Sequence, residues 1–318
     1  MSELVEFIDG PLILVSWIST TSFIVIGRMF FTPGKNYFKA AWLNLVLFGV
    51  VFAAFINLSY LVKKPIYSLP YYCYARVWNG TWKRACLLIF FVAQLFASFI
   101  FCAVQTTRTA KATTAHRKFF HFTIGLIAFT GMIFDPKFVR LSAHLMLQIF
   151  IIIEHLRSLE SPPWSSFLNP YLQTFIDPNQ ESESLILTPI LLIFGVFLPL
   201  LFSPITEARP LALYHFAGIA TVAIGDSFAA IIGSKFGSTK LSKPFQSRKS
   251  LQGSLAMLFG QGIFYSALLG FGIVPYHGIS DLIKIAIAVP VCTFAEAALS
   301  FGDNIILPSL AWLILSWP

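Results

Sequence analysis

The stretch GDSFAAIIGSKFGSTKLSKPFQSRKSLQGS, residues 225–254, joins the two features around which the chain is organised. It begins with an acid, Asp226, that directly follows the apolar run AGIATVAIG. It then continues into a loop that contains spaced glycines and several lysine and arginine residues. A charged side chain inside an apolar segment is costly and marks a functional site by default. The acid and the basic loop together predict a site that handles phosphate groups at a bilayer surface.

The composition places this stretch in a membrane protein. Of 318 residues, 57% are hydrophobic and 11% are charged, whereas a soluble domain carries about 25% charged residues. The net charge is +8, but the basic residues lie in short loops between apolar runs. No continuous basic face or nucleic-acid-binding module is visible. The charge therefore indicates contacts with anionic headgroups or soluble anions, and argues against a nucleic-acid partner.

Ten apolar runs approach or reach the length that crosses a hydrocarbon layer of about 30 Å. In lipid each backbone amide must be satisfied within its own segment, which favours helices. We predict an all-α, polytopic transmembrane helix bundle of about ten spans, with eight to eleven as the range. The runs lie near residues 11–31, 41–62, 86–106, 119–135, 138–155, 185–204, 211–233, 252–274, 282–300 and 304–317.

The loops carry two further signals. Basic residues are more numerous in the loops after the first, third, fifth and seventh runs, so we expect these loops to be cytoplasmic. In the long connection 156–184, apolar residues from Trp164 to Ile176 recur every three or four positions. This spacing predicts an amphipathic helix in the interface, either a simple surface helix or one that borders an entry path for a lipid.

Asp226 is the first candidate site residue. Mg2+ is typically held by one or two carboxylates together with phosphate oxygens, and it accompanies nucleoside triphosphates. We therefore predict that Asp226 is a metal ligand, with the neighbouring Ser227 as a source of a hydroxyl ligand. The alternative is a buried acid that is paired with a basic residue for packing.

The glycines of the opening stretch are the second candidate group. Gly233 and Gly237 are four residues apart, a spacing that more often marks a helix-packing face. Here the basic loop follows at once, which favours anion binding. Arg248 and Lys249 suit bidentate and point-charge contacts to phosphate, respectively. The sequence contains no P-loop pattern.

Ionisable side chains elsewhere form two more groups. Arg117 and His121 are four residues apart, so a helix places them on one face with Lys118 beside them. The alternative for this group is an aromatic and basic belt at the membrane interface. Glu296 precedes Asp303 by about two helical turns, so both would point into one cavity if the helix continues between them.

Several short motifs, taken in order from about residue 116 to residue 314, resemble the dolichol kinase family. They are RKFFHF, GMIFDP, EHLR, ESLILTPILLIFG, IGDSFAAIIGSKFG, RKSLQGS and FAEAALSFGDNIILPSL. The CTP-dependent diacylglycerol kinases and phytol kinases share the Gly-Asp and Lys-Ser-x-x-Gly elements. Residues 1–110 contain no family motif. The resemblance thus implies N-terminal transmembrane helices of unclear role over 1–110 and a catalytic domain over 111–318.

The resemblance implies a multi-pass enzyme of the endoplasmic reticulum that transfers the γ-phosphate of CTP to dolichol, giving dolichyl phosphate for protein N-glycosylation. The implied cofactor is a divalent cation, Mg2+, on Asp226, and the partners are CTP, dolichol and the bilayer. The predicted catalytic residues are Asp226, Glu296, Asp303, Arg117 and His121. The predicted CTP-binding residues are Gly233, Ser234, Gly237, Lys243, Arg248, Lys249, Ser250 and Gly253.

One departure and several alternatives remain open at this point. Family members usually carry an acid where this chain has Gln252. The nearest alternative function is a CTP-dependent kinase of another lipid alcohol, diacylglycerol or phytol. A more distant alternative is a noncatalytic membrane homologue or a transporter, although no pair of broken spans typical of transporters is visible.

Overall fold

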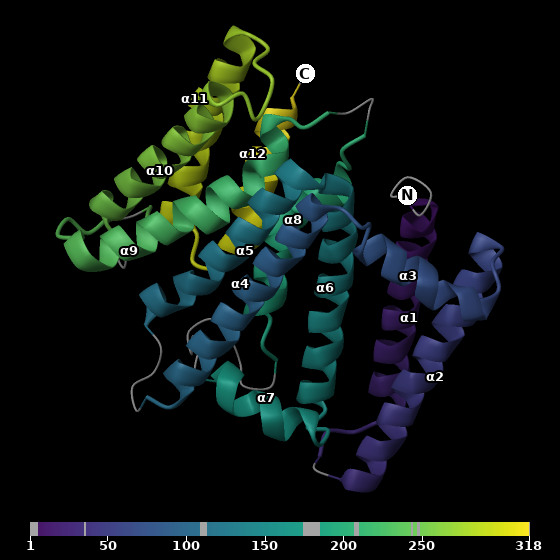
Figure 1. Ribbon diagram of the computed structural model, residues 1–318. Coiled ribbons are helices and arrows are strands. Elements are labelled where there is room, and N and C mark those ends of the chain that lie inside the picture. Colours follow the sequence, from purple (N-terminus) through teal and green to yellow (C-terminus); the bar gives the residue numbers. More distant parts are fainter. Residues whose placement is uncertain are drawn as a thin grey trace. The chain divides into compact units, whose positions relative to one another are not determined.

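The computed structural model describes residues 6–34, 36–108, 113–173, 185–206, 210–242, 244–246 and 249–317. Within these ranges all regular structure is helical, and no strand is formed (Figure 1). Each apolar run predicted from the sequence falls on a helix, which confirms the all-α fold class. The α-helices are α1 (Asp9–Phe30), α2 (Tyr37–Val62), α3 (Leu69–Val77), α4 (Trp82–Thr106), α5 (Thr114–Phe134), α6 (Pro136–Ser158), α7 (Trp164–Gln173), α8 (Thr188–Phe202), α9 (Ser227–Phe236), α10 (Leu251–Gly270), α11 (Ile279–Ala298) and α12 (Asp303–Ser316).

Six of the described helical segments are long and apolar enough to cross a membrane. They are Glu6–Phe30, Tyr37–Val62, Trp82–Thr106, Pro136–Ser158, Leu213–Phe236 and Leu251–Gly270. Helices α8 and α12 are also apolar, but they are only 15 and 14 residues long. The structure therefore supports a polytopic helical membrane protein, while the predicted count of about ten spans is not confirmed.

The chain divides into two compact units that alternate along the sequence. The first contains residues 1–92, 102–107 and 141–190, and the second contains residues 93–101, 108–140 and 191–318. The sequence predicts a boundary near residue 110 between N-terminal helices of unclear role and a catalytic domain. This division by function stays a prediction.

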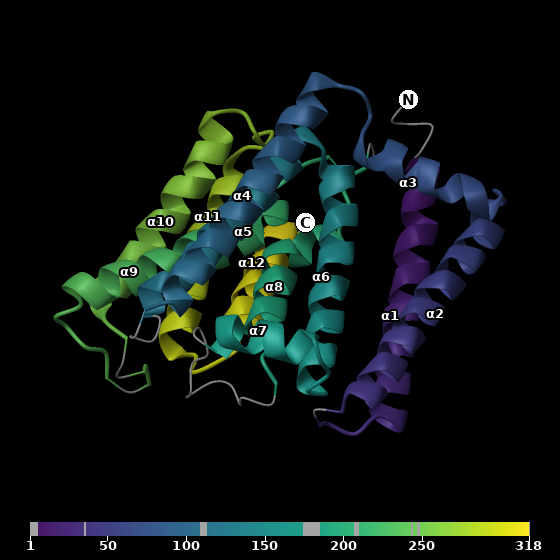
Figure 2. The same cartoon turned by 60° about the horizontal axis from the view of Figure 1, so that its bottom comes forward.

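The first unit is built on the antiparallel pair α1 and α2, which run side by side in both views (Figures 1 and 2). Phe23, Leu43 and Leu156, from α1, α2 and α6, share one buried cluster. Arg76 of α3 donates two hydrogen bonds of 2.7 Å to the carboxylate of Asp9, the first residue of α1. These contacts fix α3 at the end of the pair.

The amphipathic helix predicted in the 156–184 connection is present as α7. The indole Nε1 of Trp164 donates to Asn44 Oδ1 at 2.9 Å, which attaches α7 to α2. The Phe167 side chain is exposed, as an interfacial helix requires. The rest of the predicted helix, beyond residue 173, lies outside the described residues.

In the second unit, glycines permit close helix crossings. A Cβ atom added at Gly125 of α5 would lie 2.4 Å from the Cβ of Ala223. A Cβ added at Gly195 of α8 would lie 1.6 Å from the carbonyl oxygen of Asn304, at the start of α12. Only a residue without a side chain fits at these two positions, so the glycines set where α5 and α12 approach their neighbours.

Candidate active site

Asp226 is placed by an irregular helix. The segment Ile219–Asp226 is π-helical and continues directly into α9, so Asp226 is the residue that precedes α9. Short π-helical segments inside α-helices are frequent at functional sites, because the extra residue in the turn changes the direction of the side chains that follow. Asp226 is 4% exposed. Its carboxylate is therefore held inside the second unit.

Helix α5 supplies two partners for this carboxylate. The Lys118 ammonium group forms an ion pair with Asp226 Oδ2. His121 Nε2 lies 3.4 Å from the same oxygen and 3.4 Å from Lys118 Nζ. Both of these contacts involve Oδ2 of Asp226. Its other oxygen, Oδ1, forms no hydrogen bond or ion pair with a described residue.

The His121 ring is oriented by its second nitrogen. Nδ1 lies 3.3 Å from the carbonyl oxygen of Arg117, one turn earlier in α5. The carbonyl can only accept, so Nδ1 carries a proton in this contact. His121 Nε2 thus lies against both members of the Lys118–Asp226 ion pair.

A hairpin between α9 and α10 brings in a second ion pair. Lys240 and Ser250 pair as an isolated antiparallel bridge, and Leu251 N donates to the Thr239 carbonyl at 2.9 Å. The hairpin holds Lys249 at its end, where the ammonium group pairs with Glu296 Oε1. Lys249 is 22% exposed at its side chain and Glu296 only 2%. The pair therefore has one face toward the loop and one inside the helix bundle.

The hairpin is also fixed to the last turn of α11. Gln246 donates through its backbone N to the Ala297 carbonyl at 3.0 Å and through Nε2 to the Ala298 carbonyl at 3.1 Å. The rings of Phe245 and Phe294 meet edge to face, with centroids 4.9 Å apart. The position of Lys249 is thus set by several contacts besides its ion pair.

Glu296 and Asp303 do lie in one cluster, but not for the reason that the sequence suggested. The helix does not continue between them: α11 ends at Ala298, and Gly302, at a φ of 75°, turns the chain back into α12. Asp303 is the first residue of α12, within electrostatic reach of Asp226. The antiparallel hairpin of α11 and α12, rather than a shared helix face, brings the two acids together.

The cluster is unbalanced in charge. Three carboxylates, Asp226, Glu296 and Asp303, meet two ammonium groups, Lys118 and Lys249. Burial by itself lowers the pKa of Lys249, but the carboxylates of Glu296 and Asp226 outweigh it and raise that pKa above its ordinary value. Counted by formal charge, the three carboxylates exceed the two ammonium groups by one among the described residues.

The oxygen atoms of the cluster fit a divalent cation that is held mainly by its substrate. Among the described residues, no group of three or more His, Cys, Asp and Glu side chains converges on a metal position. Mg2+ bound with a nucleotide needs only one or two carboxylates from the protein. Asp226 Oδ1 is open, and Asn304 Oδ1 is buried without a hydrogen-bond partner among the described groups. Ser227 Oγ, the other predicted ligand, is also buried without a described partner.

Several of the predicted nucleotide-binding residues lie near the start of α10. Ser250 caps this helix by accepting from the Gly253 N–H at 3.3 Å. A Cβ atom at Gly253 would lie 2.9 Å from the Ala229 carbonyl oxygen of α9, and one at Gly237 would lie 2.6 Å from Oγ of Ser250, the N-cap of α10. The glycines thus have a packing role between α9 and α10, and their contact with CTP stays a prediction.

The other members of the predicted set are placed unequally. Ser234 is exposed, and its hydroxyl donates to the Ile231 carbonyl at 2.9 Å within α9. Lys243 and Arg248 lie outside the described residues. Lys249 is in the cluster, as described above.

Gln252, the departure from the family pattern, has a defined structural role. Its Oε1 accepts from the Thr239 N–H at 3.2 Å, and its Nε2 donates to Ser238 Oγ at 2.8 Å. An amide provides both the acceptor and the donor that these contacts need. Gln252 therefore fastens the first arm of the hairpin to the first turn of α10.

Arg117, a predicted catalytic residue, and the buried acid Glu154 have other contacts. The Arg117 side chain donates to Thr114 Oγ1 at 3.3 Å, and its carbonyl receives His121. Glu154 accepts two hydrogen bonds of 2.7 Å from Arg157 and one of 2.7 Å from the Ile186 N–H. Glu154 therefore belongs to a structural ion pair of the first unit.

No sequence pattern assigned a definite role to Lys118 or Asn304. Lys118 is three positions before His121, so the helical spacing that grouped Arg117 with His121 also carried this signal. Asn304 follows Asp303 directly, and its side chain neighbours His121. The position of Asn304 depends on the close approach of α8 and α12 at Gly195, which no local sequence pattern reveals.

Dolichol kinases of other organisms are similar to this chain over much of its length. The chain is 26% identical to mouse dolichol kinase over 282 residues, which cover 86% of this chain and 49% of the mouse protein. It is 28% identical to human dolichol kinase over 258 residues, which cover 79% of this chain and 44% of the human protein. For dolichol kinase of Saccharomyces cerevisiae the identity is 28% over 207 residues, or 65% of this chain and 37% of the yeast protein.

The chain spans about half the length of these relatives, or less. No protein-family model matches the sequence, and no solved structure matches it either. The matches nevertheless extend over most of the chain and across animals, fungi and plants. They confirm the resemblance carried by the motifs: this chain is similar in sequence to the dolichol kinases.

Proposed function

We propose that the chain is a lipid kinase that transfers the γ-phosphate of CTP to dolichol, giving dolichyl phosphate and CDP. The observation that carries the proposal is one cluster of charges beside the hairpin between α9 and α10. Asp226, Lys118 and Glu296 in it are buried, and Lys249 and Asp303 are partly buried. The names of the relatives support dolichol as the acceptor. CTP as the donor follows from the family resemblance.

The cluster suits phosphoryl transfer, which depends chiefly on positioning and on neutralising charge. Lys249 and Lys118 would each place a positive charge beside the phosphate oxygens. Asp226 Oδ1 and Asn304 Oδ1 would hold Mg2+, which when bound supplies further neutralisation of the triphosphate. The leftover negative charge of the cluster matches this divalent cation.

The acceptor hydroxyl needs a group that orients it and takes its proton. Glu296 forms an ion pair with Lys249. The Asp303 carboxylate accepts a 2.9 Å hydrogen bond from the Asn304 N–H, and the charged groups around it act at longer range. We assign Asp303 to this role. The dolichol oxygen forms the new bond to the γ-phosphorus, the bond from this phosphorus to the bridging oxygen of CDP breaks, and the hydroxyl proton passes to Asp303.

The location of the protein follows from the same proposal. The product would serve N-glycosylation, so the chain would lie in the endoplasmic reticulum membrane, with the hairpin 237–250 on the cytoplasmic side where CTP is found. The excess of basic residues in the loops on that side supports this orientation.

The test is a transfer assay with purified protein in liposomes and Mg2+. CTP and ATP labelled at the γ-phosphate are offered separately, each with dolichol, diacylglycerol or phytol. Label that passes from CTP to dolichol alone is the expected result. Label on diacylglycerol or phytol would replace the proposed acceptor, and no transfer to any lipid by folded protein would contradict a kinase function.

A further inference from the structure

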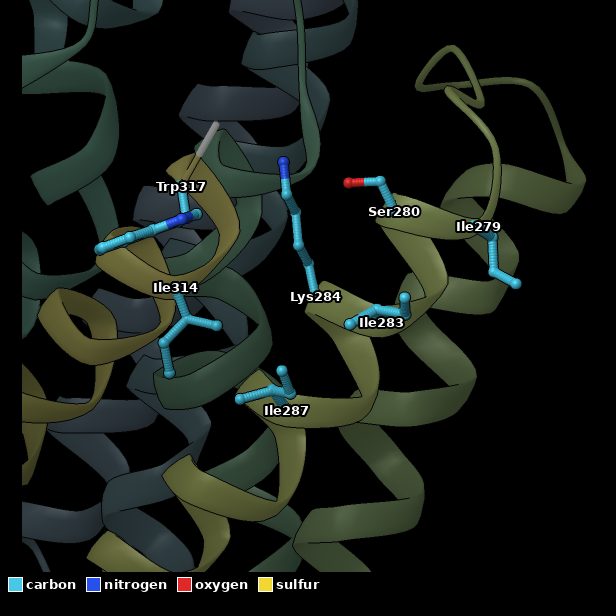
Figure 3. Close-up of a pocket in the computed structure, with 7 residues that line it drawn as sticks. All are labelled: Ile279, Ser280, Ile283, Lys284, Ile287, Ile314 and Trp317. Atoms are coloured by element: carbon cyan, nitrogen blue, oxygen red, sulfur yellow. The ribbon is translucent and has the colours of Figure 1, made fainter.

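A groove lies between the first turns of α11 and the last turn of α12. Its volume is about 470 Å³, and Figure 3 shows the side chains that line it. Ile279, Ile283 and Ile287 recur every four residues and so share one face of α11, and Ile314 of α12 lies opposite. The long wall of the groove is therefore aliphatic.

One end of the groove is polar. The Lys284 side chain extends toward the level of Ser280 and Trp317, away from Ile287 and Ile314 (Figure 3). These three residues also line an adjoining cavity of about 280 Å³. A lysine and a tryptophan at one level are typical of the headgroup region of a bilayer.

Lys284 has no partner for its positive charge within the part of the chain that the structure describes. Lys284 makes no hydrogen bond or ion pair with any described residue. The nearest acid, Asp281, is engaged by His277, whose backbone N–H donates at 2.7 Å and whose Nδ1 lies at 3.4 Å. The groove thus combines an aliphatic wall with a single cationic end, which is complementary to an amphiphile that has an anionic head.

The groove is distinct from the candidate active site. Lys284 and Glu296 are twelve residues apart on α11, a separation of about 18 Å along a helix. Asp303 begins α12, and Trp317 directly follows its end. The groove and the acid cluster therefore lie at opposite ends of the α11–α12 hairpin.

We propose that this groove binds an anionic phospholipid of the surrounding bilayer. The lipid phosphate contacts Lys284 Nζ and Ser280 Oγ, and one acyl chain lies along Ile283, Ile287 and Ile314. A polyprenol fits less well, because it has no anionic group to match Lys284. Its hydroxyl is also required at the other end of the hairpin.

The experiment is photo-crosslinking of the whole chain in liposomes. Phosphatidylserine and phosphatidylcholine, each with a photoreactive diazirine in one acyl chain, are compared at equal content, and labelled peptides are identified by mass spectrometry. We expect the phosphatidylserine probe to label the segment 279–287. Lys284→Gln should reduce that labelling about fivefold, the factor expected for one basic residue near an anionic surface.

Two further variants sharpen the test. Lys83→Gln removes an exposed lysine beside the exposed Trp82 at the start of α4, and it should leave labelling of 279–287 unchanged. Ile287→Trp fills the aliphatic wall without a change of charge, and it should reduce labelling by the phosphatidylserine probe.

Three results would overturn the proposal. The first is equal labelling by the two probes with no effect of Lys284→Gln, because the segment would then contact bulk lipid only. The second is unchanged labelling in Ile287→Trp. The third is labelling of 279–287 by a photoreactive polyprenol that excess phosphatidylserine does not displace, since the groove would then hold a polyprenol tail. None of these readouts depends on catalysis.

Discussion

Asp226 and Lys118 form a buried ion pair, and changing them singly and together separates a catalytic role of the acid from a structural one. The two side chains are 6% and 10% exposed. Asp226→Asn removes the carboxylate charge and leaves the Lys118 ammonium buried without its partner. Breaking a buried pair on one side costs about 3–5 kcal/mol, because the remaining charge is uncompensated.

The double variant Asp226→Asn with Lys118→Met removes both charges. Replacing both members of a buried pair is often close to neutral for stability. We therefore expect the free energy of unfolding to fall by about 3–5 kcal/mol in Asp226→Asn and to return toward the wild-type value in the double variant. Activity should be lost in both, since neither retains the carboxylate that would hold the cation.

The assay pairs two measurements on the same preparations. Unfolding of the protein in mixed micelles is followed by circular dichroism as the denaturing detergent is increased, and transfer of label from CTP to dolichol is measured in liposomes. Activity that recovers together with stability in the double variant would refute the catalytic role, because the carboxylate would then be needed only to pair with Lys118.

Three more predictions follow from single contacts. Gly195→Ala should lower the free energy of unfolding by about 1–3 kcal/mol, as overpacking does, and should lower activity by displacing the start of α12. The control Gly262→Ala should be tolerated, because its added Cβ meets no atom within 4 Å. Equal effects of the two changes on thermal unfolding and on phosphate transfer would contradict this prediction. Gln252→Ala should raise the KM for CTP about fivefold, which corresponds to the loss of roughly one hydrogen bond, and should change kcat little. An unchanged KM would show that the hairpin does not depend on the contacts of Gln252. Glu154→Gln should destabilise the protein by about 3–5 kcal/mol, because it leaves the buried Arg157 charge without its carboxylate. The specific activity of the folded fraction, measured after gel filtration, should stay constant. A selective loss of kcat would instead indicate a catalytic role for Glu154.

Much of this architecture could be predicted from local sequence patterns. Apolar run length located the described α-helices except α3 and α7, because a segment in lipid must satisfy its own backbone. The spacing of apolar residues predicted α7, and α3 was not predicted. Asp226 and Glu296 could be singled out because a charged side chain inside an apolar segment is costly. Spacing on one helix grouped Arg117 with His121, and it was the neighbouring Lys118 that proved to reach Asp226.

The remaining features depend on contacts between distant parts of the chain. The pairing of Lys249 with Glu296 requires the hairpin to dock on the end of α11, which no periodicity records. The turn at Gly302 replaced the continuous helix expected between Glu296 and Asp303. The sequence favours an anion-binding role for Gly233 and Gly237, and the structure adds contacts with Ser250 and Gly253 that only the neighbouring helix reveals.

The most direct test of the account is transfer of label from γ-labelled CTP to dolichol by the purified wild-type protein, with Asp226→Asn measured beside it. The account predicts labelled dolichyl phosphate that depends on Mg2+ and on Asp226. Equal transfer by the two proteins would contradict the assignment of the site, and no transfer by folded wild-type protein would contradict the proposed activity itself.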